Sequence, residues 1–122
     1  MLVAEDDVGL RESVVEILAS EGMDTTAVGN GTDALAELSE GAFDLVITDV
    51  VMPSPLGVQV AAMARTAGEG VPILVITASR DPAIPAVVSQ LDHARLLLKP
   101  FSRADLVRQV EALLPRVRSA AS

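Results

Sequence analysis

Five polar side chains, found at four separated places along this chain, have the types needed for phosphoryl chemistry. Four of them directly follow a short apolar run: Glu5, Asp49, Thr77 and Lys99. The fifth, Asp6, comes directly after Glu5. Carboxylate oxygens are preferred ligands of Mg²⁺, and a carboxylate can also accept a phosphoryl group covalently. A hydroxyl and an ammonium group can bind and neutralise the oxygens of that group. If the fold gathers these residues, they would suit a divalent cation beside a phosphoryl group.

The apolar runs before these residues have the composition of parallel strands that are buried on both faces. They lie at 2–4, 45–48, 73–76 and 94–98. Thr25–Val28 indicates a further strand, and its threonines suggest an edge position. Because the carboxyl ends of parallel strands lie along one edge of a sheet, the polar residues that follow the strands should meet there.

Helical spacing of apolar residues separates these strands. The predicted helices lie at 8–20, 30–38, 57–67 and 102–114, and the last is opened by a capping box between Ser102 and Asp105. A weaker helical pattern follows Pro82 and Pro85, whose missing amide hydrogens should delay or fray its start.

This alternation predicts an α/β domain of the flavodoxin-like doubly wound class. Its five-stranded parallel sheet would have the order 2-1-3-4-5, with helices on both faces. In that order the first and third strands are neighbours. Glu5, Asp6 and Asp49 would therefore lie at the switch point, where open α/β sheets bind ligands.

Length and composition exclude several classes of protein. A chain of 122 residues forms one domain, which we expect over 1–115, with 116–122 as a disordered tail or linker stump. The chain has no cysteine, which excludes a disulfide framework and a thiolate metal site. It has no basic N-terminal region followed by a long apolar stretch and no apolar run long enough for a membrane span, so a cytoplasmic protein is expected. The net charge of −8 argues against direct nucleic-acid binding. Six of the nine basic residues lie in 93–122, as either a solvated helix surface or a docking surface for an acidic partner.

Four sequence fragments resemble the receiver domain of two-component response regulators, and the similarity extends over residues 2–114. The fragments are Val3-Ala4-Glu5-Asp6-Asp7, Ile47-Thr48-Asp49-Val50-Val51-Met52-Pro53, Ile76-Thr77-Ala78 and Leu98-Lys99-Pro100-Phe101. The resemblance implies that Asp49 is the phosphoacceptor and that Thr77 and Lys99 bind phosphoryl oxygens. It also implies a cis peptide at Lys99-Pro100. The implied Mg²⁺ site, in which Mn²⁺ could substitute, consists of Glu5, Asp6, Asp49 and the main-chain carbonyl of Val51.

The resemblance further implies a signalling module that takes a phosphoryl group from a histidine kinase or a histidine phosphotransfer protein. Such a module assists its own phosphorylation and dephosphorylation, and switches the surface of its C-terminal helices, but it is not a conventional turnover enzyme. The chain would be a single-domain response regulator or the receiver of a hybrid histidine kinase. The short segment before Glu5 favours the second slightly. A homodimer through the last helices is a further option, and neither nucleic acid nor membrane is an expected direct partner.

Some positions depart from the usual receiver pattern. Receivers often have Tyr or Phe three residues before the lysine, as a switch coupled to the phosphorylation site, whereas this chain has Leu96. A signal would then have to travel by other means. Val51 and Ser79 would flank the phosphoryl group, and neither offers a carboxylate or carboxamide to orient a hydrolytic water. We therefore expect a long-lived aspartyl phosphate.

Three alternative functions fit less of the pattern. A haloacid-dehalogenase-like phosphatase also forms an aspartyl phosphate, but it would need a second aspartate where this chain has Val51. A flavin-binding protein of the same fold would need a hydroxyl-rich phosphate loop and stacking aromatics, yet the only aromatic residues are Phe43 and Phe101. A pseudo-receiver that is never phosphorylated is the third alternative, although the acceptor, hydroxyl and lysine positions are all filled.

Overall fold

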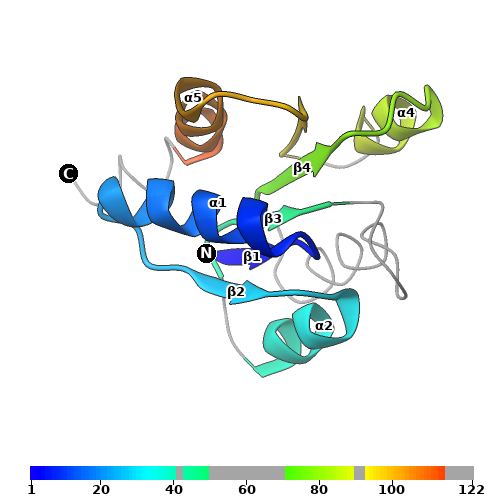
Figure 1. Cartoon of the computed structure of the whole chain (residues 1–122). Helices are drawn as coiled ribbons and strands as arrows, with labels where there is room; N and C mark the ends of the chain where they lie inside the picture. The colour runs from blue at the N-terminus through cyan, green and yellow to red at the C-terminus, as the bar shows by residue number, and fades with distance from the viewer. Residues whose placement is uncertain (41–42, 50–70, 90–92, 115–122) are drawn as a thin grey trace.

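The computed structural model describes residues 1–40, 43–49, 71–89 and 93–114. In these ranges five parallel strands form one sheet in the order β2-β1-β3-β4-β5 (Figure 1). The strands are β1 (Leu2–Ala4), β2 (Thr26–Val28), β3 (Val46–Thr48), β4 (Ile73–Thr77) and β5 (Ala94–Leu98). The predicted flavodoxin-like order is therefore confirmed, as is the edge position of β2.

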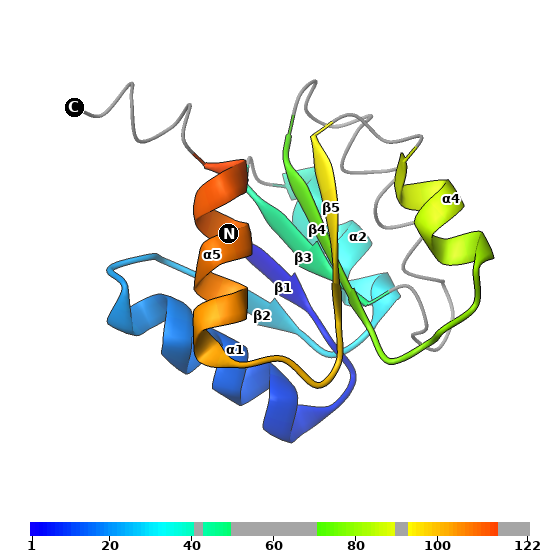
Figure 2. The same cartoon turned by 90° about the horizontal axis from the view of Figure 1, so that it is seen from above.

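Helices cover both faces of this sheet. They are α1 (Val8–Ser20), α2 (Gly31–Glu40), α4 (Ala83–Ser89) and α5 (Arg103–Leu113). Figure 2 shows α1 and α5 on one side of the sheet and α2 and α4 on the other. Each face has its own hydrophobic core: Leu74 and Ile76 pack with α1 and α5, whereas Ile73 and Val75 pack with α2 and α4. Burial on both faces explains why the central strands are continuous apolar runs.

Side-chain caps determine where two of these helices begin. The carboxylate of Asp7 accepts a hydrogen bond from the amide of Leu10 at 3.1 Å, so Asp7 is the N-cap of α1. At α5 the hydroxyl of Ser102 accepts from the amide of Asp105, and the carboxylate of Asp105 accepts from the amide of Ser102. The capping box expected from the sequence is present.

The start of α4 shows how two prolines can be accommodated. The helix begins at Ala83, so Pro85 lies in its first turn, where an amide would have no intrahelical acceptor. The carboxylate of Asp81 accepts from the amide of Ala83 at 2.9 Å and closes this turn. The helix therefore starts directly after Pro82, and the delayed or frayed start that the two prolines led us to expect is not seen.

Other boundaries differ from the prediction by one or two residues. The strand predicted to end at residue 76 continues to Thr77, and α2 runs to Glu40 instead of residue 38. The predicted helix at 57–67 and the tail at 116–122 lie outside the described residues. Within the described part of the chain, no helix is both long and apolar enough to cross a membrane.

Candidate functional site

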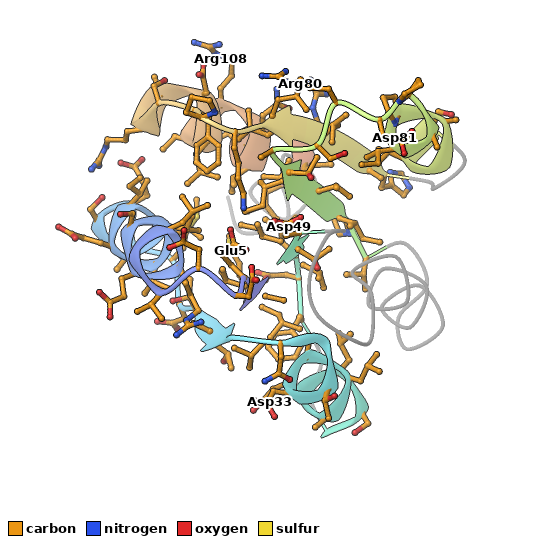
Figure 3. The ribbon with its side chains drawn as sticks, turned by 45° about the vertical axis from the view of Figure 1, so that its right-hand side comes forward. Glu5, Asp33, Asp49, Arg80, Asp81 and Arg108 are labelled. Atoms are coloured by element: carbon orange, nitrogen blue, oxygen red, sulfur yellow. The ribbon has the colours of Figure 1, made fainter. Side chains whose placement is uncertain are left out.

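Three carboxylates meet where β1 and β3 end. One oxygen from each of Glu5, Asp6 and Asp49 lies within 4.8 Å of the others. Glu5 is fully buried and Asp49 is 4% exposed, whereas Asp6 is open to solvent. The amide of Asp49 donates to the carbonyl of Ala4 at 3.3 Å, which holds the two strand ends side by side. Figure 3 shows Glu5 and Asp49 together in the centre of the molecule, with Asp33, Asp81 and Arg108 far from them.

Lys99 brings a cation to this cluster from the end of β5. Its ammonium group donates to Oδ2 of Asp49 at 2.7 Å and also to Oε1 of Glu5. The backbone amide of Lys99 donates to the carbonyl of Thr77 at 2.8 Å, which fixes the lysine beside the end of β4. The Lys99-Pro100 peptide bond that follows is cis, in agreement with the sequence-based expectation.

Burial and charge act against each other at this ion-pair cluster. Burial raises the pKa of Glu5, because desolvation disfavours the carboxylate, although the hydrogen bond from Lys99 partly opposes this effect. Burial alone would lower the pKa of Lys99, but its hydrogen bonds to Asp49 and Glu5 outweigh burial and raise that pKa. The lysine therefore stays an ammonium ion at neutral pH.

Thr77 is the last residue of β4, and Ser79 follows the end of this strand. Thr77 is fully buried, and its hydroxyl accepts a hydrogen bond from the amide of Ser79 at 3.1 Å. Thr48 of β3 pairs with Val75 of β4, and Thr77 lies two residues beyond Val75. Thr77 and Ser79 therefore lie along the same edge of the sheet as Asp49. Leu96 is half-buried on β5 opposite Val75 and packs against the core on the α2 and α4 face. Val51, expected to supply a carbonyl ligand, lies outside the described residues.

The donor set of this cluster fits a divalent cation with a preference for oxygen. Glu5, Asp6 and Asp49 offer only carboxylate oxygens, and the described residues include no cysteine. Mg²⁺ is bound in proteins by one or a few carboxylates together with waters and phosphate oxygens. Asp6 is exposed, so water can reach the cluster from its side.

Arg11 contacts the cluster and was not predicted to do so. Its guanidinium group, from the start of α1, donates to the main-chain carbonyl of Glu5 at 2.8 Å. One signal in the sequence was available, because a basic residue near a helix N-terminus opposes the helix dipole and needs another reason to be there.

Comparisons with known proteins agree with this geometry. The model of the response regulator receiver domain family matches residues 1–111. The DNA-binding response regulator MtrA of Mycobacterium tuberculosis is 36% identical over 116 residues, which cover 95% of this chain and 50% of MtrA. The response regulator receiver protein CpdR of Brucella abortus is 34% identical, with 93% of this chain and 95% of CpdR covered. The chain thus spans about half the length of MtrA and nearly all of CpdR.

Solved structures show the same similarity in three dimensions. A response regulator receiver protein from Sinorhizobium medicae superposes with a TM-score of 0.83 at 32% identity, over 93% of this chain and 92% of that one. The response regulator TrrA of Thermotoga maritima, solved in complex with Mg²⁺ and BeF, gives 0.81 at 31% identity, over 93% and 96%. Sequence, topology and the acidic strand-end cluster lead to one conclusion: this chain belongs to the receiver domain family of response regulators in two-component signalling.

Proposed function

We propose that this receiver domain accepts a phosphoryl group on Asp49 from the phosphohistidine of a histidine kinase or a histidine phosphotransfer protein. The observation that carries the proposal is the ammonium group of Lys99, which lies 2.7 Å from Oδ2 of Asp49 at the carboxyl edge of the sheet. This edge is where doubly wound sheets bind their ligands. The lysine is therefore already beside the carboxylate on which new negative charge would accumulate.

The transfer needs no proton to be removed from Asp49. An oxygen of its ionised carboxylate attacks the phosphorus atom, a P–O bond forms, and the P–N bond to the donor imidazole breaks. The bonding electron pair returns to the imidazole nitrogen. The ammonium of Lys99 would then bind one phosphoryl oxygen. The hydroxyl of Thr77 accepts from the amide of Ser79 through a lone pair, so its O–H would still donate to another phosphoryl oxygen.

Glu5, Asp6 and Asp49 would hold Mg²⁺ or Mn²⁺, with the main-chain carbonyl of Val51 as a further ligand. The cation, when bound, neutralises negative charge on the carboxylates and on the transferred group. Glu5 is buried and bonded to Lys99, so it would act mainly through water, whereas the exposed Asp6 is free to act directly. Repulsion between three neighbouring carboxylates gives the cluster a further reason to bind a cation.

In this proposal the protein is a cytoplasmic signalling module and not a conventional turnover enzyme. Phosphorylation would switch the surface of its C-terminal helices, and the same helices could support a homodimer. MtrA is described as DNA-binding, but this chain spans only about half of MtrA, so direct nucleic-acid binding is not part of the proposal. A single-domain regulator and the receiver of a hybrid histidine kinase both fit this role.

Intact-mass spectrometry tests the proposal directly. Wild-type protein would be incubated with acetyl phosphate and Mg²⁺, beside Asp49→Asn, an EDTA control and the matched variant Asp33→Asn. Asp33 lies on α2, away from the cluster, in Figure 3. One added phosphoryl group is expected in the wild type and in Asp33→Asn, and none in Asp49→Asn or with EDTA.

The absence of an adduct would need a second measurement, because a small donor differs from a protein donor. Beryllofluoride mimics a phosphoryl group without chemistry, so its binding with Mg²⁺ would be followed by NMR. Failure of both acetyl phosphate and beryllofluoride would favour a pseudo-receiver and overturn the proposal. Binding of beryllofluoride alone would favour a receiver that is specific for its protein donor.

A further inference from the structure

The peptide unit that joins the two consecutive carboxylates, Glu5 and Asp6, is held at both of its polar ends. Its carbonyl oxygen, on Glu5, accepts a hydrogen bond from Nη1 of Arg11 at 2.8 Å. Its amide, on Asp6, donates to Oε2 of Glu5 at 3.0 Å. The amide of Glu5 itself donates to the carbonyl of Val28 on β2 at 3.1 Å. Rotation of this peptide plane would redirect the Asp6 side chain, so its orientation decides whether the carboxylates converge.

Gly29, directly after β2, leaves the space that Arg11 needs. A Cβ atom placed on Gly29 would lie 2.7 Å from Nη1 of Arg11 and 3.5 Å from its Cζ. The backbone of Gly29 is not in the left-handed region, since Gly22 is the one glycine with positive φ among the described residues. An alanine at position 29 would therefore fit the backbone but would push the guanidinium group away from the carbonyl of Glu5.

From these contacts we infer that Arg11 is a positioning residue for the cation site and that Gly29 is its steric partner. Arg11 would hold the Glu5–Asp6 peptide so that the two side chains and Asp49 present their oxygens to one divalent cation. The inference rests on the proposed function in one respect, namely that these carboxylates bind Mg²⁺.

The direction in which Arg11→Ala changes the affinity for Mg²⁺ distinguishes a positioning role from a purely electrostatic one. The guanidinium group is a positive charge close to a site for another cation, so its charge alone disfavours metal binding. If charge were its main contribution, Arg11→Ala would bind Mg²⁺ more tightly. If Arg11 acts by orienting the peptide, the same substitution weakens binding, and groups that orient ligands typically contribute 10–100-fold in affinity.

Isothermal titration calorimetry with Mg²⁺ would measure this effect in Arg11→Ala, Gly29→Ala and the double variant. We expect Kd to rise about tenfold in each single variant and the double variant to be no weaker than Arg11→Ala, because Cβ at position 29 has no guanidinium left to displace. Controls are Arg108→Ala, on the exposed surface of α5, and Gly9→Ala, where Cβ would meet only Oδ1 of Asp7 at 3.5 Å. Circular dichroism would confirm that each variant is folded.

Each outcome decides the question. An unchanged or tighter Kd in Arg11→Ala would overturn the inference, as would an unchanged Kd in Gly29→Ala or effects that add in the double variant. These results leave the proposed function intact, because the wild type would still bind Mg²⁺. A wild type that binds no Mg²⁺ would overturn the inference and the proposed metal site together.

Discussion

The ammonium group of Lys99 lies 2.7 Å from a carboxylate oxygen of Asp49 and simultaneously bonds the carboxylate of Glu5. Its side chain is 19% exposed, whereas those of Glu5 and Asp49 are 0% and 6% exposed. Because these charged groups are largely buried, both their desolvation cost and their mutual attraction are larger than in a surface salt bridge. One cation thus compensates two carboxylates that arrive from different strands.

Removal of the ammonium group should therefore destabilise the protein in the absence of metal. We expect Lys99→Met to lower the free energy of unfolding by about 3 kcal/mol at neutral pH in EDTA, because it leaves two buried carboxylates uncompensated. Urea denaturation measures the change. The double variant Glu5→Gln/Lys99→Met should recover part of the loss, and the exposed Arg108→Met should change stability by less than about 0.5 kcal/mol. A Lys99→Met protein as stable as the wild type would contradict this account.

Mg²⁺ should stabilise the folded protein, because only the folded chain gathers the three carboxylates. At a concentration of about 100 times Kd, linkage predicts a gain of about 2.7 kcal/mol in the free energy of unfolding. The melting temperature with and without Mg²⁺ would show this gain. Asp6→Asn should lose most of the Mg²⁺-dependent shift, and Asp33→Asn should keep it. An equal shift in both variants would place the cation elsewhere.

The aspartyl phosphate should persist for minutes or longer in purified protein with Mg²⁺. Val51 and Ser79, the two residues expected to flank the phosphoryl group, have no carboxylate or carboxamide to position a hydrolytic water. Loss of the phosphorylated mass with time gives the half-life. Val51→Asn should shorten it, whereas Val8→Asn, an exposed substitution at the start of α1, should not. A half-life of seconds in the wild type would refute the expectation.

Acid should remove the stabilisation that the capping box gives to α5. The amide of Ser102 donates to the carboxylate of Asp105, and this lowers the pKa of Asp105 below its ordinary value of 3.8. A lowered pKa in the folded state means that the contribution is complete well above pH 3.8 and is lost as the pH falls through the folded pKa. At neutral pH, Asp105→Asn should therefore be less stable than the wild type.

Urea denaturation from about pH 3 to about pH 7 would follow the difference in stability between wild type and Asp105→Asn. This pH range runs from near the ordinary pKa of an aspartate up to neutral pH. The difference in unfolding free energy between wild type and Asp105→Asn should narrow as the pH falls below 3.8. Glu111→Gln, an exposed substitution near the other end of α5, should show no such pattern. A gap that stays constant with pH would mean that the Asp105 carboxylate contributes through its shape and not its charge.

The sequence allowed the sheet order and the strand-end cluster to be predicted for a common reason. Parallel strands that are buried on both faces are nearly pure apolar runs, so the polar residues after them stand out, as Asp49 and Lys99 do. Topology then places such residues at one edge. The bond from Lys99 to Glu5 could not be predicted in the same way, because it depends on ångström-scale distances between side chains from opposite ends of the sequence.

The contact of Arg11 with the Glu5 carbonyl escaped prediction for a related reason. Its partner is a main-chain atom, which has no residue type that a pattern could detect. The effect inferred for Gly29 could not be predicted either, because it depends on the absence of a side chain that would contact Arg11. Helix and strand ends, such as the extra residue at Thr77, depend on single hydrogen bonds that composition does not specify.

The placement of α5 has a consequence for how the chain is made. Within this domain, translation produces β1 and α1 before the other elements, yet β1 lies inside the sheet and has both neighbours only after β3 has been synthesised. The core on the α1 side closes only with Leu106 and Val110 of α5. Until residues 103–113 have left the ribosome, α1 alone can cover this apolar face of the sheet, so a chaperone would bind the nascent domain at this stage.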